Sequence, residues 1–336
     1  MRRLLLAALL ALPLCAHASS VRIGVVPVKG GEYADALLAG AQRAAKDFTT
    51  VDAAVTVDSY VPATPDTAGQ AAALLKAASS GCTGLLLNPA AGAKSPAFLS
   101  KIEDAYRSGC QGIVVDVPFS SPYVASLVGT GFYQAGQEAG AYLAKRIGGD
   151  GGVLIVGDSK AALSIAQYEK GIIEGLRLYP NAQAIGSGDL AQMIAAYAPS
   201  EVPGLLKRLG SRVAAVCVAD PEALPDVLAA LKDPAVTAKP VVMVFGNRKA
   251  ALAALRAGEI DSVIADCPYL VGYYGLKAAV AAARGKPVPA QRNVATRILT
   301  ADKLDDPKIA AFLDPAASNA PIEDEKPSRP SLIENP

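Results

Sequence analysis

Carboxylates and amides that follow predicted strands are the residues of this sequence best suited to chemistry or recognition. Asn88 and Asp116 each end an apolar run in the first half of the chain, and Asp220, Asn247 and Asp266 do so in the second half. Asp116, Asp220 and Asp266 could serve in glycoside hydrolysis or bind a hard cation such as Ca²⁺, but their spacing fits no compact loop. Hydrogen bonding to a ligand, helix capping and bonding between the two halves of the chain are the other interpretations.

The lack of histidine limits the chemistry further. The chain has a single histidine, His17, and it lies in a predicted secretory signal. Without an imidazole, the mature chain has no Ser-His-Asp triad, no histidine base and no histidine metal ligand. We therefore expect a protein without catalytic or metal-binding residues, and a secreted enzyme that uses the aspartates is the less favoured hypothesis.

The predicted signal sequence spans residues 1–18. It consists of a basic start at Met1–Arg3, an apolar core at 4–14 and the cleavage pattern Ala16-His17-Ala18. Its removal leaves 30 basic against 31 acidic residues of the 32 and 31 in the whole chain. This balance favours neither nucleic acid nor an anionic membrane surface. We expect a periplasmic, monomeric protein whose mature chain starts at Ser19.

The polar residues that follow the predicted strands are positioned by a fold of alternating strands and helices. Apolar runs predict strands over 21–27, 53–59, 83–87, 112–115, 125–129, 153–156, 182–185, 213–219, 240–245 and 262–265. Helical periodicity separates them, with a last long helix over 270–283. This order predicts an α/β fold of two Rossmann-like, doubly wound parallel-sheet lobes. Ligands in such sheets bind beyond the carboxyl ends of the strands, so the polar residues should converge on a cleft between the lobes.

The segment 126–146 is the expected first connection between the lobes. It reads as a short strand, a break at Gly129 and Gly131, and a helix that contains Gly136. The last glycine spacing is two residues too long for a dinucleotide-binding fingerprint, and a secreted protein rarely meets free dinucleotides. We assign these glycines to hinge formation and helix packing, and we expect no cofactor.

Several stretches, in their order and spacing, resemble the type I, ribose-binding-like periplasmic binding proteins over residues 21–300. They are Gly40-Ala41-Gln42, Leu85 to Pro89, Ile113 to Asp116, Gly258-Glu259-Ile260, Val263 to Pro268 and Arg284 to Val288. The resemblance implies three crossovers between the lobes, near Thr130, Asp266 and Ala295–Thr296, and closure on a small molecule by hinge motion. The implied division is a signal peptide at 1–18, an N-terminal lobe at 19–129 plus 267–294, a C-terminal lobe at 130–266 plus 295–314, and a flexible tail at 315–336.

The same resemblance implies roles for individual residues. Asn88 and Asp116 match positions that bond sugar hydroxyls, Tyr33 matches a stacking aromatic, and Lys170 falls near a ring-clamping arginine. Asp220 and Asp266 stand where amides are usual. Val117 replaces an arginine, and Gly30, Gly31 and Gly246 replace polar residues, which argues against a common pentose or hexose. The expected ligand-binding set is Tyr33, Asn88, Asp116, Phe119, Phe132, Lys170, Asp220, Asn247 and Asp266.

The resemblance implies a solute-binding protein that delivers its ligand to an ABC importer. The segment 128–136 also resembles the branch that holds the trimethylamine-oxide sensor protein, so the partner could be a sensor kinase in place of a permease. A cleft with fewer hydroxyl-bonding residues could instead take a larger or amphipathic molecule. Both alternatives remain open at this point.

The mature chain has four cysteines, Cys82, Cys110, Cys217 and Cys267. Cys82 and Cys110 each lie three residues before the first apolar residue of a strand, and these two strands should be neighbours. In-register neighbours could bring the Cα atoms within disulfide range. We therefore expect a Cys82–Cys110 disulfide, with two buried thiols as the alternative, and buried thiols at the other two positions.

Overall fold

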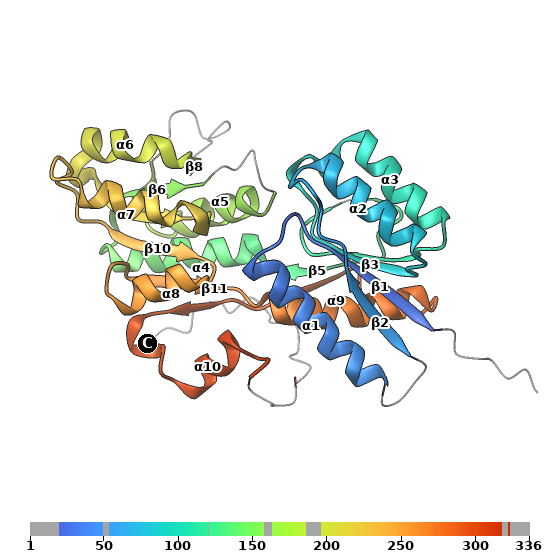
Figure 1. Ribbon diagram of the computed structural model, residues 1–336. Helices are drawn as coiled ribbons and strands as arrows, with labels where there is room; N and C mark the ends of the chain where they lie inside the picture. The colour runs from blue at the N-terminus through green and yellow to red at the C-terminus, as the bar shows by residue number, and fades with distance from the viewer. Residues whose placement is uncertain are drawn as a thin grey trace, which may run out of the picture.

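The computed structural model describes residues 20–49, 54–119, 121–157, 163–185, 196–317 and 322. The predicted signal sequence and most of the predicted tail lie outside these residues. Figure 1 shows two α/β lobes side by side, one with β1 to β5 and the other with β6 to β11. This arrangement confirms the predicted fold class.

The first sheet has six parallel strands in the order β12-β5-β4-β3-β1-β2. Side chains alternate across it, so Leu86 and Val114 lie in one apolar cluster while Leu85 and Ile113 lie in another. Both faces are therefore buried, which explains the continuous apolar runs in the sequence. The strands are β1 (Val21–Val26), β2 (Val55–Ser59), β3 (Gly84–Leu87), β4 (Gly112–Val115), β5 (Ser126–Thr130) and β12 (Gln291–Val294).

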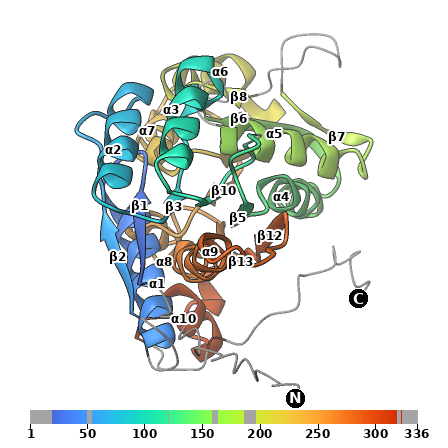
Figure 2. The ribbon, with the colours of Figure 1, turned by 90° about the vertical axis from the view of Figure 1, so that its right-hand side faces the viewer.

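Helices cover both faces of this sheet. The helices α1 (Glu32–Thr49) and α9 (Pro268–Ala283) pack on one face, and α2 (Thr67–Ser79) and α3 (Pro96–Arg107) pack on the other. Figure 2 shows α1 and α9 next to each other. They approach closely because Gly40 has no side chain: a Cβ there would lie 1.8 Å from the Tyr269 carbonyl oxygen.

The second sheet has the order β13-β11-β10-β9-β6-β7, and β8 also pairs with β6. β13 is antiparallel to β11, so this sheet is mainly but not wholly parallel. No sequence pattern indicates β12 or β13, since both are short and largely polar or part-exposed. The strands are β6 (Asp150–Val156), β7 (Asn181–Ala184), β8 (Ala196–Tyr197), β9 (Val213–Val218), β10 (Val241–Phe245), β11 (Ser262–Ala265) and β13 (Arg297–Leu299).

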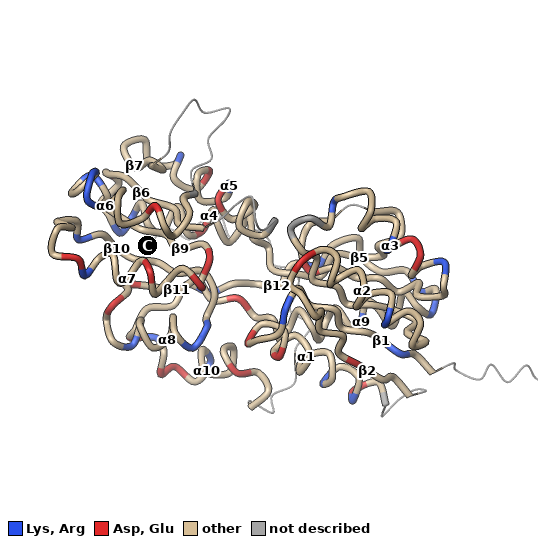
Figure 3. The backbone as a smooth tube through the Cα atoms, turned by 45° about the horizontal axis from the view of Figure 1, so that its top comes forward, with Lys and Arg blue, Asp and Glu red and all other residues tan. Residues whose placement is uncertain are grey.

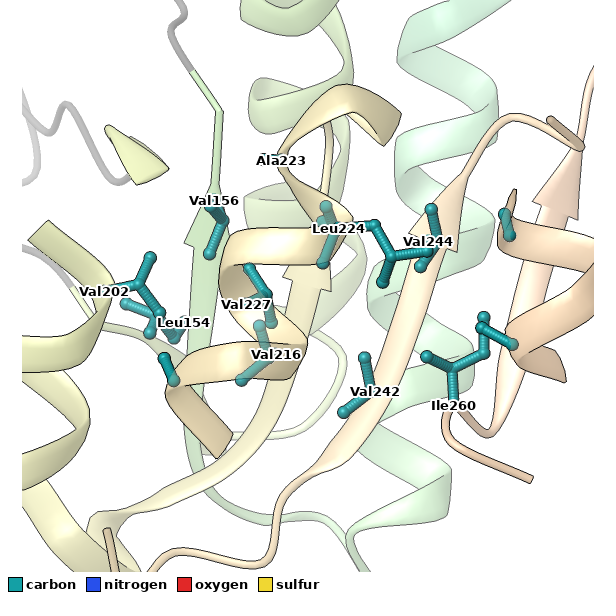
Figure 4. Packing of buried hydrophobic residues seen from close by; sticks show 14 of the residues in the cluster. Leu154, Val156, Val202, Val216, Ala223, Leu224, Val227, Val242, Val244 and Ile260 are labelled. Atoms are coloured by element: carbon teal, nitrogen blue, oxygen red, sulfur yellow. The ribbon is translucent and has the colours of Figure 1, made fainter. Parts of the chain in front are cut away.

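Helices of the described residues cover both faces of the second sheet. α4 (Phe132–Arg146) and α5 (Leu163–Leu176) cover one face, and α6 (Val202–Leu209), α7 (Leu224–Lys232) and α8 (Lys249–Arg256) cover the other. Figure 4 shows Val202 and Val227 directed at strand residues such as Leu154 and Val216. Short α10 (Pro307–Leu313) follows β13. The 3₁₀ turns are η1 (Ala91–Lys94), η2 (Pro199–Glu201), η3 (Gly210–Arg212), η4 (Pro221–Ala223) and η5 (Ala301–Lys303).

The chain passes between the sheets three times among the described residues. These passages follow β5, β11 and β12, at Gly131, at Asp266-Cys267 and at Ala295-Thr296. Figure 3 shows lysine and arginine positions interspersed with aspartate and glutamate positions over both lobes. Parallel pairing brings the carboxyl ends of neighbouring strands to the same edge of each sheet. Asn88, Asp116 and Asp266 lie at these edges.

Candidate functional site

Asp116 is the centre of a hydrogen-bonded group in the first lobe. It follows β4 directly, is 1% exposed, and accepts hydrogen bonds from Tyr33 Oη at 2.7 Å and Asn88 Nδ2 at 2.9 Å. Asn88 follows the adjacent strand β3, and Tyr33 lies in the first turn of α1, after β1. Three neighbouring strands thus bring these residues together, and we call Tyr33, Asn88 and Asp116 the Asp116 cluster.

Gln70 holds the backbone of Asn88 in place through a hydrogen bond. It is fully buried on α2, and its Nε2 donates to the carbonyl oxygens of Asn88 at 2.6 Å and Pro27 at 3.2 Å. Its Oε1 accepts from the backbone N–H of Ala90 at 2.8 Å. Our sequence reasoning missed this residue, although a glutamine within the small and apolar sequence of α2 was an available signal.

Burial changes the acidity of the Asp116 cluster. It raises the pKa of Asp116 to about 6, although the hydrogen bonds from Asn88 and Tyr33 act in the opposite direction. The pKa of Tyr33 is held well above its usual value, first by burial and then by the nearby Asp116 carboxylate. Asp116 is therefore a hydrogen-bond acceptor whose charge changes in the mildly acidic range.

A second polar group lies at the strand ends of the other lobe. Asp266 follows β11 and is 1% exposed, and Arg248 Nη1 lies 3.6 Å from its Oδ1. With the Asn247 amide oriented to donate, its nitrogen lies 2.8 Å from Asp266 Oδ1 and 2.9 Å from the Asp266 carbonyl oxygen. Burial raises the pKa of Asp266, whereas Arg248 lowers it. We call Asn247, Arg248 and Asp266 the Asp266 cluster.

The two clusters face each other across the lobes. The guanidinium carbon of Arg248 lies 5.4 Å from the centre of the Tyr33 ring, a cation–π contact between lobes. Beside it, Glu32 Oε2 accepts from the backbone N–H of Lys249 at 3.1 Å, and Lys29 forms an ion pair with Glu222. Arg248 was absent from our predicted set, although it follows Asn247 at the carboxyl end of β10.

The remaining predicted residues lie in different surroundings. Phe132 packs against Phe245, with ring centres 5.6 Å apart, and Phe119 is partly buried against the core of the first lobe. Lys170 is exposed on α5, and Asp220 accepts from the N–H of Glu222 at 3.0 Å, which caps η4. No hydrogen bond or ion pair between described residues joins these four to either cluster. Their contact with a ligand stays a prediction.

The predicted disulfide is not formed in this structure. Cys82 and Cys110 are free, buried thiols, although β3 and β4 pair in the expected register with Gly84 opposite Gly112. The sulfur of Cys82 donates to the hydroxyl of Tyr60 at 3.6 Å, and both cysteines lie in the apolar cluster beneath α2 and α3. Burial raises the pKa of Cys110 to about 12, so its thiol stays protonated.

Membrane-spanning helices and metal-binding groups are absent among the described residues. No helix among the described residues has the length and apolar character required to cross a membrane. Within the same residues, His, Cys, Asp and Glu side chains form no group of three or more that could hold a metal ion. The carboxylates of Asp116 and Asp266 are contacted by tyrosine and amide donors and by the Arg248 guanidinium.

The fold is that of a two-lobed binding protein, with one polar cluster at the strand ends of each lobe. The chain belongs to the family described as periplasmic binding protein domain, which it matches over residues 23–287. No curated protein matches the chain in sequence.

Solved structures share this fold at low sequence identity. An ABC transporter solute-binding protein from Burkholderia graminis, in complex with D-arabinose, superposes with a TM-score of 0.70 at 19% identity, over 86% of this chain and 98% of that one. The glucose-galactose binding protein GanP from Geobacillus stearothermophilus gives 0.69 at 20% identity, over 85% and 99%. A solute-binding protein from Bacillus halodurans with bound myo-inositol gives 0.68 at 17% identity, over 88% and 100%.

Proposed function

We propose that this chain captures a small, hydroxyl-bearing solute between its lobes and delivers it to an ABC importer in the periplasm. The observation that supports this most directly is the pair of facing clusters around Asp116 and Asp266. Each of these two aspartates is 1% exposed. Each Asp116 oxygen accepts one hydrogen bond from the chain and keeps acceptor capacity for a solute hydroxyl. The solutes of the similar structures, D-arabinose and myo-inositol, are also rich in hydroxyls.

The same proposal includes closure of the two lobes on the solute by hinge motion. The three passages between the sheets would serve as hinges, and the division into lobes at residues 129/130, 266/267 and 294/295 would follow them. A solute that contacts both clusters favours the closed arrangement because only that arrangement offers both sets of contacts. Phe119, Phe132, Lys170 and Asp220 complete the proposed binding set, to which we add Arg248.

Isothermal titration of the chain from Ser19 onward with pentoses, hexoses and cyclitols tests this function. We expect a saturable heat with at least one of these solutes and its loss in Asp116→Ala. Asp35→Ala is the matched control, because it removes an exposed carboxylate from the same end of the first lobe. Recovery of chemically unchanged solute after incubation would exclude the aspartate-based enzyme. Absence of binding to every polyol would contradict the proposed function.

A further inference from the structure

Asp116 is a buried carboxylate whose hydrogen bonds come from neutral groups. Its two side-chain contacts are with the Tyr33 hydroxyl and the Asn88 amide. Among the ion pairs of the described residues, none involves Asp116, whereas Asp266 has Arg248 at 3.6 Å. The two facing clusters thus contain two buried carboxylates and one guanidinium.

The residue next to Asp116 supplies no positive charge. Val117 is 5% exposed and packs in the apolar cluster that includes Phe132 and Phe245 of the other lobe. Lys29 is paired with Glu222 and is half-exposed, outside the buried group. An ionised carboxylate in a buried site is costly without a compensating charge, and the ion pairs of the described residues supply none to Asp116.

Arg248 shows that the space between the clusters accepts a cation. Its guanidinium lies over the Tyr33 ring and beside Asp266, where the aromatic face and the carboxylate both favour positive charge. The side chains in contact with Asp116 are Tyr33 and Asn88, and Arg248 reaches this group through the Tyr33 ring. The two clusters together carry one net negative charge when both carboxylates are ionised.

We propose that the solute carries a protonated amine in addition to its hydroxyls, and that this amine pairs with Asp116. This inference rests on the proposed function and narrows its substrate class. The raised pKa of Asp116, about 6, agrees with it, since the carboxylate lacks a cationic partner in the ligand-free protein. At neutral pH the carboxyl is mainly ionised and an amine is protonated, so both partners of the ion pair are present.

Matched pairs of probes test the inference. The titrations compare D-glucosamine with D-glucose, D-galactosamine with D-galactose, and 1-amino-1-deoxysorbitol with sorbitol, at pH 7.5. We expect at least one amine to bind at least tenfold more tightly than its neutral partner. The preference should disappear in Asp116→Asn, which keeps the size of the side chain and removes the charge, and should persist in Asp35→Asn. Equal or tighter binding of the neutral partner overturns the inference and leaves the proposed function intact.

A measurement without ligand keeps the inference testable if no amine in the panel binds. Asp116→Asn should raise the melting temperature of the ligand-free protein at pH 8 and have a smaller effect at pH 4.5, because it removes an unbalanced buried charge. An unchanged melting temperature at pH 8 would show that the chain itself balances Asp116, and would overturn the inference. If no probe binds, neutral or cationic, the proposed function fails, whichever result this measurement gives.

Discussion

The buried carboxyl of Asp116 should make the ligand-free protein less stable as pH rises. Its pKa is raised from 3.8 to about 6, so the folded state holds the proton more tightly than the unfolded state does. Below pH 3.8 both states are protonated and burial of the group carries no charge penalty. As pH rises through about 6, the folded state must hold the ionised carboxylate, and stability falls.

The size of this effect follows from the shift. A shift of about two pKa units corresponds to about 3 kcal/mol at pH 8, of which about 2 kcal/mol develops between pH 4.5 and pH 8. Asp116→Asn removes this pH dependence. It also disturbs one hydrogen bond, because an amide nitrogen then faces the donor of Asn88 or Tyr33, at a cost of about 1 kcal/mol. The variant should therefore be more stable than wild type by about 2 kcal/mol at pH 8.

Urea unfolding followed by circular dichroism, at half-unit steps from pH 4.5 to pH 8.5, measures the difference between wild type and variant. Carboxyls that titrate alike in both proteins cancel in this difference. Asp266, whose pKa is also raised by burial, contributes a loss of the same sign to both proteins. Asp35→Asn serves as the exposed control and should give a difference close to zero at all pH values. A difference for Asp116→Asn that does not change with pH would refute the reasoning.

Three further predictions concern packing, positioning and the thiols. Gln70→Ala leaves the N–H of Ala90 without its partner and should lower the free energy of unfolding by about 2 kcal/mol or more, measured by urea unfolding; an unchanged value would contradict its role. Gly40→Ala should cost at least about 2 kcal/mol, because its Cβ would lie 1.8 Å from the carbonyl oxygen of Tyr269. Gly204→Ala has open space around it and should instead be neutral or stabilising by up to about 1 kcal/mol; equal losses for both variants would count against this explanation. Thiol titration of the chain from Ser19 onward, denatured without reductant, should give four free thiols, and a count of two would restore the disulfide.

The secondary structure could be predicted because its causes are local. Buried strands such as β3 and β4 read as continuous apolar runs, since both faces of a parallel sheet are covered by helices. β12 could not be found in this way. Its residues are exposed or part-exposed up to Val294, so neither alternation nor an apolar run marks it.

The predicted disulfide is not formed in this structure, although the strand register it assumed is correct. Register brings the two backbones together, but the direction of each sulfur depends on its side-chain contacts. The sulfur of Cys82 donates a hydrogen bond to the hydroxyl of Tyr60, which directly follows β2. β2 is the edge strand of the first sheet, on the opposite side of β3 from β4. No pattern around either cysteine in the sequence indicates that contact.

The sequence alone determined that Asn88, Asp116, Asn247 and Asp266 lie at the carboxyl ends of strands, because strand direction and strand ends follow from short-range patterns. Only the tertiary structure decided which of them meet, and with which partners. The contact of Arg248 with Tyr33 joins residues 215 positions apart across two lobes. It depends on how two separately folded sheets face each other, and interactions between neighbouring residues do not specify that geometry.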